Sequence, residues 1–195
     1  MLAWIDGYLV QPHSGVGREG SICPFVGPSL KAHSLRLEVW PVAAHATEDE
    51  LRSVVDRMAG VLTHEEWGSH NPALRSLVVV LGGLAPERHT LLDRAQAAAK
   101  PGLAARGLML GQFHPRCDER AARNPVFRVS RCPVALLAIR HMSLHDILFL
   151  HQEPHLFACY RDRFGTSHAK NTVADPVFTQ LFDDAARRWP TGGEE

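Results

Sequence analysis

The sequence has no long apolar run and few cysteines. No stretch of about 18 uninterrupted apolar residues occurs, so a membrane-spanning helix is not expected. The N-terminal segment, residues 1–13, has neither a basic leader nor a small-residue cleavage site, which argues against a signal peptide. The four cysteines, Cys23, Cys117, Cys132 and Cys159, include no C-x-x-C pair, so no disulfide framework is expected. These absences predict a soluble, cytoplasmic protein with reduced thiols.

Charge and the lack of signature motifs argue against several functional classes. The formal net charge is zero, whereas nucleic-acid-binding proteins usually carry a basic excess. The sequence contains no G-x-S-x-G, no paired-carboxylate pattern, no dinucleotide-binding glycine motif and no H-E-x-x-H, so hydrolase, Rossmann and zinc-protease readings have no support. Structural zinc sites typically use ligand pairs about two to four residues apart, and such pairs are not expected in the set Cys23, Cys117, Cys132 and a histidine.

Length and composition suit one folded domain. The chain has 195 residues, of which 45% are apolar and 22% charged, so it can bury a real core and disorder is not expected. We expect a single domain over residues 1–195, with a frayed tail at 190–195. The expected partner is a small-molecule substrate rather than a nucleic acid or a membrane, and a homodimer is left open.

The apolar pattern predicts helices and strands that alternate along most of the chain. Short aliphatic runs bounded by glycine or proline favour strands, and apolar residues at helical spacing favour helices. Thr47, with Glu50 three residues later, predicts a capping box at one helix start. Helices are expected at 2–10, 47–62, 86–101, 144–150 and 176–189, and strands at 35–40, 77–81, 108–113 and 134–139. This order, with an antiparallel pair possible at its end, favours an α+β fold in which helices cover a mixed sheet.

The stretch 107–142 is the strongest candidate for function. One apolar strand ends at His114 and a second ends at Arg140 and His141, with an arginine-rich, ordered loop between them. If the two strands are neighbours, the two histidines can lie close together in a pocket for a large anionic molecule. His114 can ligate a metal or a haem iron or act as an acid–base group, and His141 can be a second ligand or a distal base. Alternatively, both are structural histidines that hydrogen-bond the backbone.

Four arginines and one cysteine complete the candidate set. Arginines bind carboxylates through two parallel hydrogen bonds, which suits a substrate carboxylate or a haem propionate, although a solvated loop explains them equally well. Cys23, before Pro24, can be a thiolate ligand or nucleophile, or a small core residue. The arginines are Arg116, Arg128, Arg131 and Arg140.

Several motifs resemble known families. The segments CPFV (23–26), GLMLGQFHP (107–115), NPVFR (124–128) and LAIRHM (137–142) match a poorly characterised bacterial family that is frequent among actinomycetes. The segment CPFVGPSLK (23–31) and the strand that follows it are more distantly similar to the opening of the YqcI/YcgG family. Its members resemble haem-dependent enzymes of specialised metabolism that oxidise nitrogen. The sequence departs from that family after the strand at 77–81, where Gly82 and Gly83 replace two aromatic residues.

The resemblance implies a haem-binding oxidoreductase of bacterial specialised metabolism. Such an enzyme would oxidise an amino or guanidino nitrogen of a small amino-acid-like substrate with O2 or peroxide. His114 would be the axial ligand, with Cys23 and His141 as catalytic groups near the haem and the arginines as propionate partners. Two alternatives stay open: a cofactor-free binding or accessory protein with an arginine- and histidine-lined pocket, and an enzyme based on Cys23.

Overall fold

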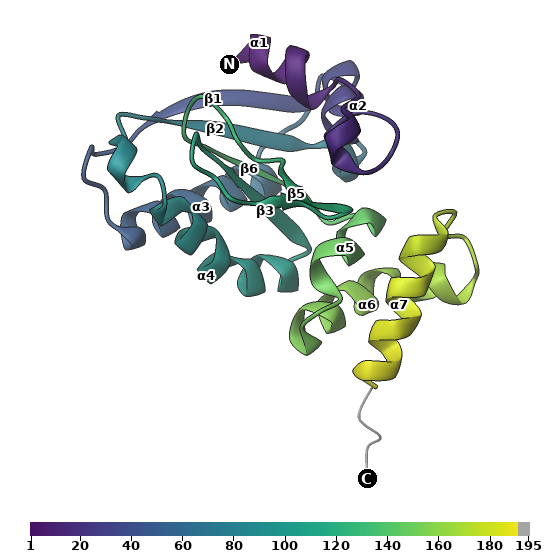
Figure 1. Ribbon diagram of the computed structural model, residues 1–195. Helices are drawn as coiled ribbons and strands as arrows, with labels where there is room; N and C mark the ends of the chain where they lie inside the picture. Colours follow the sequence, from purple (N-terminus) through teal and green to yellow (C-terminus); the bar gives the residue numbers. More distant parts are fainter. Residues whose placement is uncertain (191–195) are drawn as a thin grey trace.

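The computed structural model describes residues 1–190. It has the α+β fold that the sequence predicted, with a mixed four-stranded sheet flanked by helices (Figure 1). The strands lie in the order β1 (Leu35–Pro41), β2 (Ser76–Gly82), β6 (Leu136–His141) and β3 (Leu108–Phe113). β1 and β2 are parallel, and β6 is antiparallel to both of its neighbours. The expected antiparallel pair of late strands is therefore confirmed as β3 and β6.

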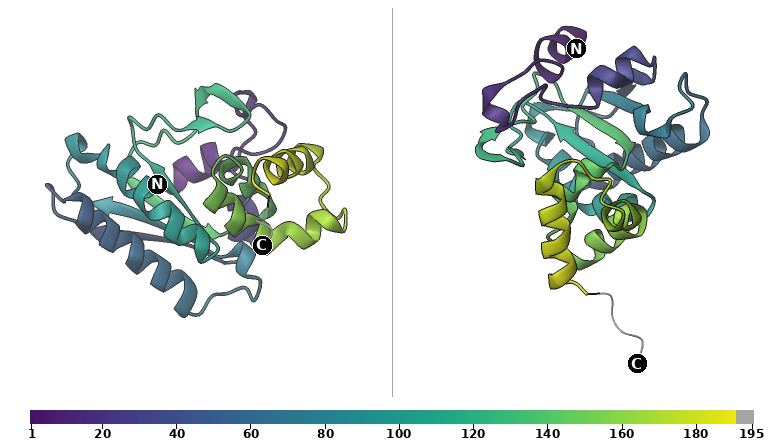
Figure 2. Two further views of the ribbon diagram at one scale, coloured as in Figure 1. Left: turned by 90° about the horizontal axis from the view of Figure 1, so that it is seen from below. Right: turned by 90° about the vertical axis from the view of Figure 1, so that its right-hand side faces the viewer.

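Two long helices cover one face of the sheet, α3 (Glu48–His64) and α4 (Leu91–Ala105), which lie side by side in Figure 2. Their apolar faces pack against alternate residues of the strands, including Leu77, Leu110 and Leu137, in the largest core cluster. The predicted capping box is present, because the Thr47 hydroxyl accepts from the Glu50 N–H while the Glu50 carboxylate accepts from the Thr47 N–H.

Short N-terminal elements cover the opposite face. They are α1 (Leu2–Trp4), a π-helical turn η1 (Ile5–Leu9), a 3-10 turn η2 (Ser14–Val16) and α2 (Val26–Lys31). Trp4 from this layer packs against the sheet near Val78 and Phe113. The helical segment predicted at 2–10 is therefore present, and the sheet is covered on both faces (Figure 1).

The chain ends in a group of helices at one end of the sheet (Figures 1 and 2). This group follows β6 and contains the 3-10 turn η5 (Leu144–Asp146), α5 (Ile147–Leu150), α6 (Pro154–Ala169) and α7 (Pro176–Arg188). It has its own apolar cluster around Phe157, Tyr160 and Phe178. Within residues 1–190, no helix has the length and apolarity needed to cross a membrane.

Two details differ from the sequence prediction. α4 passes through Pro101 and ends only at Ala105, because Leu103 and Ala104 remain buried against the core and offset the missing backbone hydrogen bond. The loop after β3 holds a small hairpin, β4 (Arg120–Ala121) with β5 (Asn124–Arg128). The remaining 3-10 turns are η3 (Pro72–Leu74) and η4 (Pro86–Arg88). The frayed tail was predicted at 190–195, and all of it except Pro190 lies outside the described residues.

Candidate metal centre

The structure separates the two histidines that the sequence had suggested as one site. β3 and β6 are neighbours, as expected, but their antiparallel register pairs Leu108 with His141 and Phe113 with Leu136. His114 therefore follows one end of β3 and His141 lies beside its other end. Six residues of strand separate them along the sheet, roughly 20 Å. The expectation of a shared pocket was wrong because a strand-end motif does not reveal strand direction.

His114 is fully buried, with no exposed side-chain surface. Its Nε2 lies 3.1 Å from Oδ1 and 3.2 Å from Oδ2 of Asp93, so one carboxylate faces the ring nitrogen with both oxygens. The other ring nitrogen, Nδ1, is buried and has no hydrogen-bond partner within the described residues. His114 is thus held by a carboxylate on one side and has a free ring nitrogen on the other.

The Asp93 carboxylate accepts from two further side chains, one in β3 and one in the loop after it. The Gln112 side-chain amide donates to Oδ1 of Asp93 at 3.3 Å, and the Cys117 thiol reaches the same oxygen at 3.7 Å. Asp93, His114 and Cys117 each offer a metal-ligand atom, and these atoms all lie within 4.8 Å of one another. Carboxylate, imidazole and thiolate together suit Zn²⁺ or iron. The cluster is the candidate metal centre.

Local backbone geometry explains why these three side chains converge. Asp93 lies in the first turn of α4, where an acidic residue is favoured by the partial positive charge of the helix N-terminus. His114 directly follows β3, and its carbonyl accepts the backbone N–H groups of Cys117 at 3.0 Å and Cys132 at 3.3 Å. A tight turn therefore brings Cys117 back beneath His114, and the second contact fixes the far end of the loop to the same carbonyl.

Burial sets the chemistry of the thiol in the absence of a cation. Cys117 has no exposed surface, and desolvation, reinforced by the nearby Asp93 carboxylate, raises its pKa to about 12. The thiol is therefore protonated and unreactive at neutral pH. Metal binding would have to displace that proton, as thiolate coordination generally does.

The rim of the centre carries two basic side chains. The His89 ring centroid lies 5.9 Å from that of His114, and the Arg116 guanidinium donates to the Pro86 carbonyl. Burial lowers the pKa of His89, and the charges of His114 and Arg116 lower it further. Asp93, whose side chain is 39% exposed, connects the buried cluster to this rim.

The other predicted residues are divided between the two ends of the sheet. Arg128 makes an exposed ion pair with Asp118, and Arg131 is exposed on the same loop. Arg140 lies at the opposite end and makes two hydrogen bonds to the fully buried carboxylate of Asp146, at 2.6 and 2.8 Å. The predicted arginine set does not form one anion-binding wall.

Cys23 belongs to the Arg140 end. The Arg140 guanidinium stacks on the Phe25 ring at 3.9 Å from its centroid, and the half-buried Cys23 is two residues before Phe25. Cys23 and His114 therefore do not share a site. The Cys23, Phe25 and Arg140 contacts tie the N-terminal layer to the end of β6.

Sequence reasoning missed Asp93 and set Cys117 aside. Their signal was present as two spaced pairs, His89 with Asp93 four residues later and His114 with Cys117 three residues later. The expectation that paired ligands are missing was wrong, because His114 and Cys117 lie three residues apart, and carboxylates were not considered as ligands.

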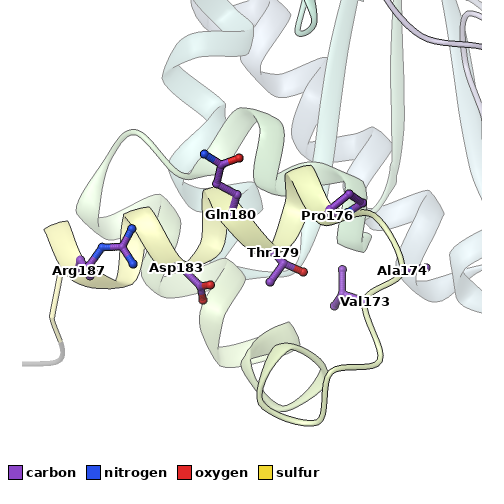
Figure 3. A pocket seen from close by; sticks show the side chains of 7 residues that line it. All are labelled: Val173, Ala174, Pro176, Thr179, Gln180, Asp183 and Arg187. Atoms are coloured by element: carbon purple, nitrogen blue, oxygen red, sulfur yellow. The ribbon is translucent and has the colours of Figure 1, made fainter.

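A shallow hollow of about 470 Å³ lies elsewhere, along the outer side of α7 (Figure 3). None of the predicted site residues lines it. Its walls are Val173, Ala174, Pro176, Thr179, Gln180, Asp183 and Arg187.

The chain belongs to the family described as domain of unknown function DUF6875, whose family model matches residues 1–175. The match covers the sheet, both helical layers and every residue of the candidate centre, and it ends directly before α7. No curated protein and no solved structure matches the chain.

Proposed function

We propose that the protein is a metal-dependent oxidoreductase whose single ion is held by Asp93, His114 and Cys117. The observation that carries this proposal is the convergence of a carboxylate, an imidazole and a thiol within 4.8 Å, two of them fully buried. These ligands come from the α4 helix and from the loop after β3, the strand that follows α4 in the chain.

The spacing of the three ligand atoms fits a single metal ion better than a haem bound through Nε2 of His114. With metal–ligand bonds of about 2.0–2.3 Å, neighbouring tetrahedral ligands lie roughly 3.3–3.8 Å apart. The Nε2–Oδ1 distance of 3.1 Å and the Sγ–Oδ1 distance of 3.7 Å are already close to that spacing. Three protein ligands leave a fourth position for a substrate or water, which is the arrangement of catalytic rather than structural sites.

The proposed reaction class comes from the sequence resemblance, and the site comes from the geometry. The substrate would be a small amino-acid-like molecule, oxidised at an amino or guanidino nitrogen with O2 or peroxide. Iron, when bound, supplies the redox chemistry that these side chains lack. Arg116, at the rim, would bind the substrate carboxylate, and His89 would form the wall beside the open position.

A haem at His114 is the second candidate, and one observation favours it. Histidines that ligate metals commonly donate their other ring N–H to a carboxylate. Here Asp93 faces Nε2, and Nδ1 is buried without a partner. In this alternative Nδ1 would be the iron ligand, Asp93 would orient the ring, and Arg128 and Arg131 would bind propionates. Cys117 would then have no role in binding.

We propose that the enzyme is cytoplasmic. The support is that all four cysteines are free thiols in the structure, as a reducing compartment would keep them. Size-exclusion chromatography with light scattering would test the homodimer that the sequence analysis left open.

Metal content and absorption of the purified protein test the proposal and separate the two candidates. Protein from cells grown with iron, zinc and haem precursor should carry about one ion per chain and show no Soret band. Cys117→Ser should lose the ion, whereas Cys159→Ser, a matched change on α6, should keep it. A Soret band that persists in Cys117→Ser and disappears in His114→Ala would establish the haem alternative. Protein that binds neither iron, zinc nor hemin would overturn the proposal.

A further inference from the structure

His141, which the fold removes from the His114 centre, has unusual surroundings of its own. It is the last residue of β6, and alternation along the strand places it on the same side as Ile139, the side covered by α3 and α4. Its ring is half-buried, and its Nε2 is buried with no hydrogen-bond partner among residues 1–190. A buried ring nitrogen without a partner costs free energy unless a ligand completes it.

One neighbour of His141 is Arg75, across the sheet. β2 and β6 pair Ser76 with Arg140, so Arg75, the residue directly before β2, lies level with His141. Its Nε donates to the Ser69 carbonyl at 3.2 Å, which holds the side chain in place and leaves the two terminal nitrogens for other partners.

The other neighbour is Arg163 of α6, on the β3 side. It lies against Gly107, the residue before Leu108, which pairs with His141. Gly107 has φ of +71°, and a Cβ at this position would collide with the Arg163 guanidinium. Glycine is therefore required at this position for two reasons: it adopts the positive φ of the turn, and it leaves room for the arginine side chain. A single contact of 3.4 Å, to the Ala105 carbonyl, occupies one of the guanidinium nitrogens.

No acidic group balances these charges. The ion pairs of residues 1–190 use other arginines, and neither Arg75 nor Arg163 has a carboxylate oxygen within 4.0 Å. Burial lowers the pKa of His141, and the charges of Arg75 and Arg163 lower it further, with no acid acting in the opposite direction. Both guanidinium groups are therefore close enough to act on the imidazole, and no carboxylate among residues 1–190 offsets them.

We propose that His141, Arg75 and Arg163 form a binding site for the phosphate group of a small phosphorylated molecule. Two arginines supply charge and paired donors for the dianion, and His141 Nε2 supplies a third donor once it carries a proton. The site lies roughly 20 Å along the sheet from His114. It therefore goes beyond the proposed metal function and shares no residue with it.

Titration of the full-length protein with inorganic phosphate, followed by calorimetry at neutral pH and constant ionic strength, tests the site. Binding should be saturable, and Arg163→Ala should weaken it by about tenfold or more, the effect of removing one charge-assisted hydrogen bond. Arg52→Ala removes an equally charged, exposed residue of α3 and should leave the affinity unchanged. Glycerol 3-phosphate and AMP then distinguish a small phosphate ester from a nucleotide as the bound class. Absence of saturable binding, or equal loss in both variants, would overturn the proposal.

The imidazole gives a second readout that does not depend on the stability of a variant. Bound phosphate would offset the charges of Arg75 and Arg163, so the pKa of His141 should rise on binding. Nitrogen-15 NMR titration of the histidine rings, with and without phosphate, measures this directly, and exposed His155 is the internal control. If phosphate binds while the His141 resonance and its pKa stay unchanged, the anion lies elsewhere and this assignment is wrong.

Discussion

The two ends of the β3–β6 pair use the same residue types and arrive at opposite electrostatic balances. Beyond Phe113, the single carboxylate of Asp93 accepts from Gln112, His114 and Cys117. At the other end, Arg140 has its own buried carboxylate while His141 has none. One end therefore offers ligand atoms for a cation. At the other end the two faces of the sheet differ, because the positive charge on one face has a carboxylate partner and the groups on the other face do not.

Strand alternation explains the difference within the second end. Arg140 and His141 are consecutive, so their side chains leave opposite faces of the sheet. Arg140 points to the face of the N-terminal layer, where it stacks on Phe25 and binds Asp146 of the helical group that follows β6. His141 lies on the side covered by α3 and α4, and the charges that lower its pKa are those of two arginines. Adjacent residues in one motif thus have unrelated roles, which variants can separate.

The largest effect should follow from Asp146→Ala. The change leaves the Arg140 guanidinium without its buried partner and also removes the acceptor for the Ser143 N–H at 2.7 Å. Breaking a buried ion pair by removing one partner typically costs about 3–5 kcal/mol in the free energy of unfolding. Urea unfolding would measure it. Asp184→Ala, which breaks the exposed pair with Arg187, should cost about 0–1 kcal/mol. Equal losses would show that the Arg140 pair is not the buried interaction described here.

The next effect is on the Asp93 end and depends on metal. If the wild-type protein binds Zn²⁺ there, adding the ion at about 100 times its dissociation constant should raise the free energy of unfolding by about 2.7 kcal/mol. Cys117→Ser should remove that gain while changing the metal-free protein much less, because serine keeps most of the thiol's volume. Thermal unfolding with and without Zn²⁺ measures both. A gain that survives in Cys117→Ser would place the ion on other ligands.

Much of the fold could be predicted from local patterns. Aliphatic runs bounded by glycine or proline gave β2 and β3, and Thr47 with Glu50 gave the start of α3. These signals are local, so they survive without knowledge of the tertiary structure. The end of α4 could not be predicted in this way, because the burial of Leu103 beyond Pro101 depends on the rest of the core.

The candidate site was predictable only in part. His114 stood out as the residue that ends an apolar strand, and it does lie at the centre of the ligand cluster. Asp93 did not, because an acidic residue in a first helical turn is ordinary for its effect on the helix dipole. The separation of His114 from His141 depends on the antiparallel register, which the long loop between the strands does not encode in any local pattern.

A smaller effect should appear in the pH dependence of stability. His141 has a pKa below its ordinary 6.5 in the folded protein. As the pH falls through 6.5, the unfolded chain therefore binds a proton that the folded chain refuses, and the free energy of unfolding decreases. Other buried histidines, His89 and His168, act in the same direction. His141→Gln should make the loss between neutral and mildly acidic pH less steep, whereas His155→Gln should not. An unchanged slope in His141→Gln would mean that His141 titrates normally.

The smallest effect is expected from Arg128→Ala, on the arginine-rich loop beside the Asp93 end. The hydrogen bond from Arg128 lowers the pKa of Asp118, and Arg120 and Arg131 add weaker attraction. Because the pair is exposed and screened by water, its loss should leave the urea midpoint unchanged while the pKa of Asp118 moves up toward its ordinary value. Carbon-13 NMR of the carboxylate measures the second quantity. A marked fall in the urea midpoint would instead show that this loop is tied to the core through Arg128, and that the contrast between a solvated arginine loop and the buried Arg140 pair is wrong.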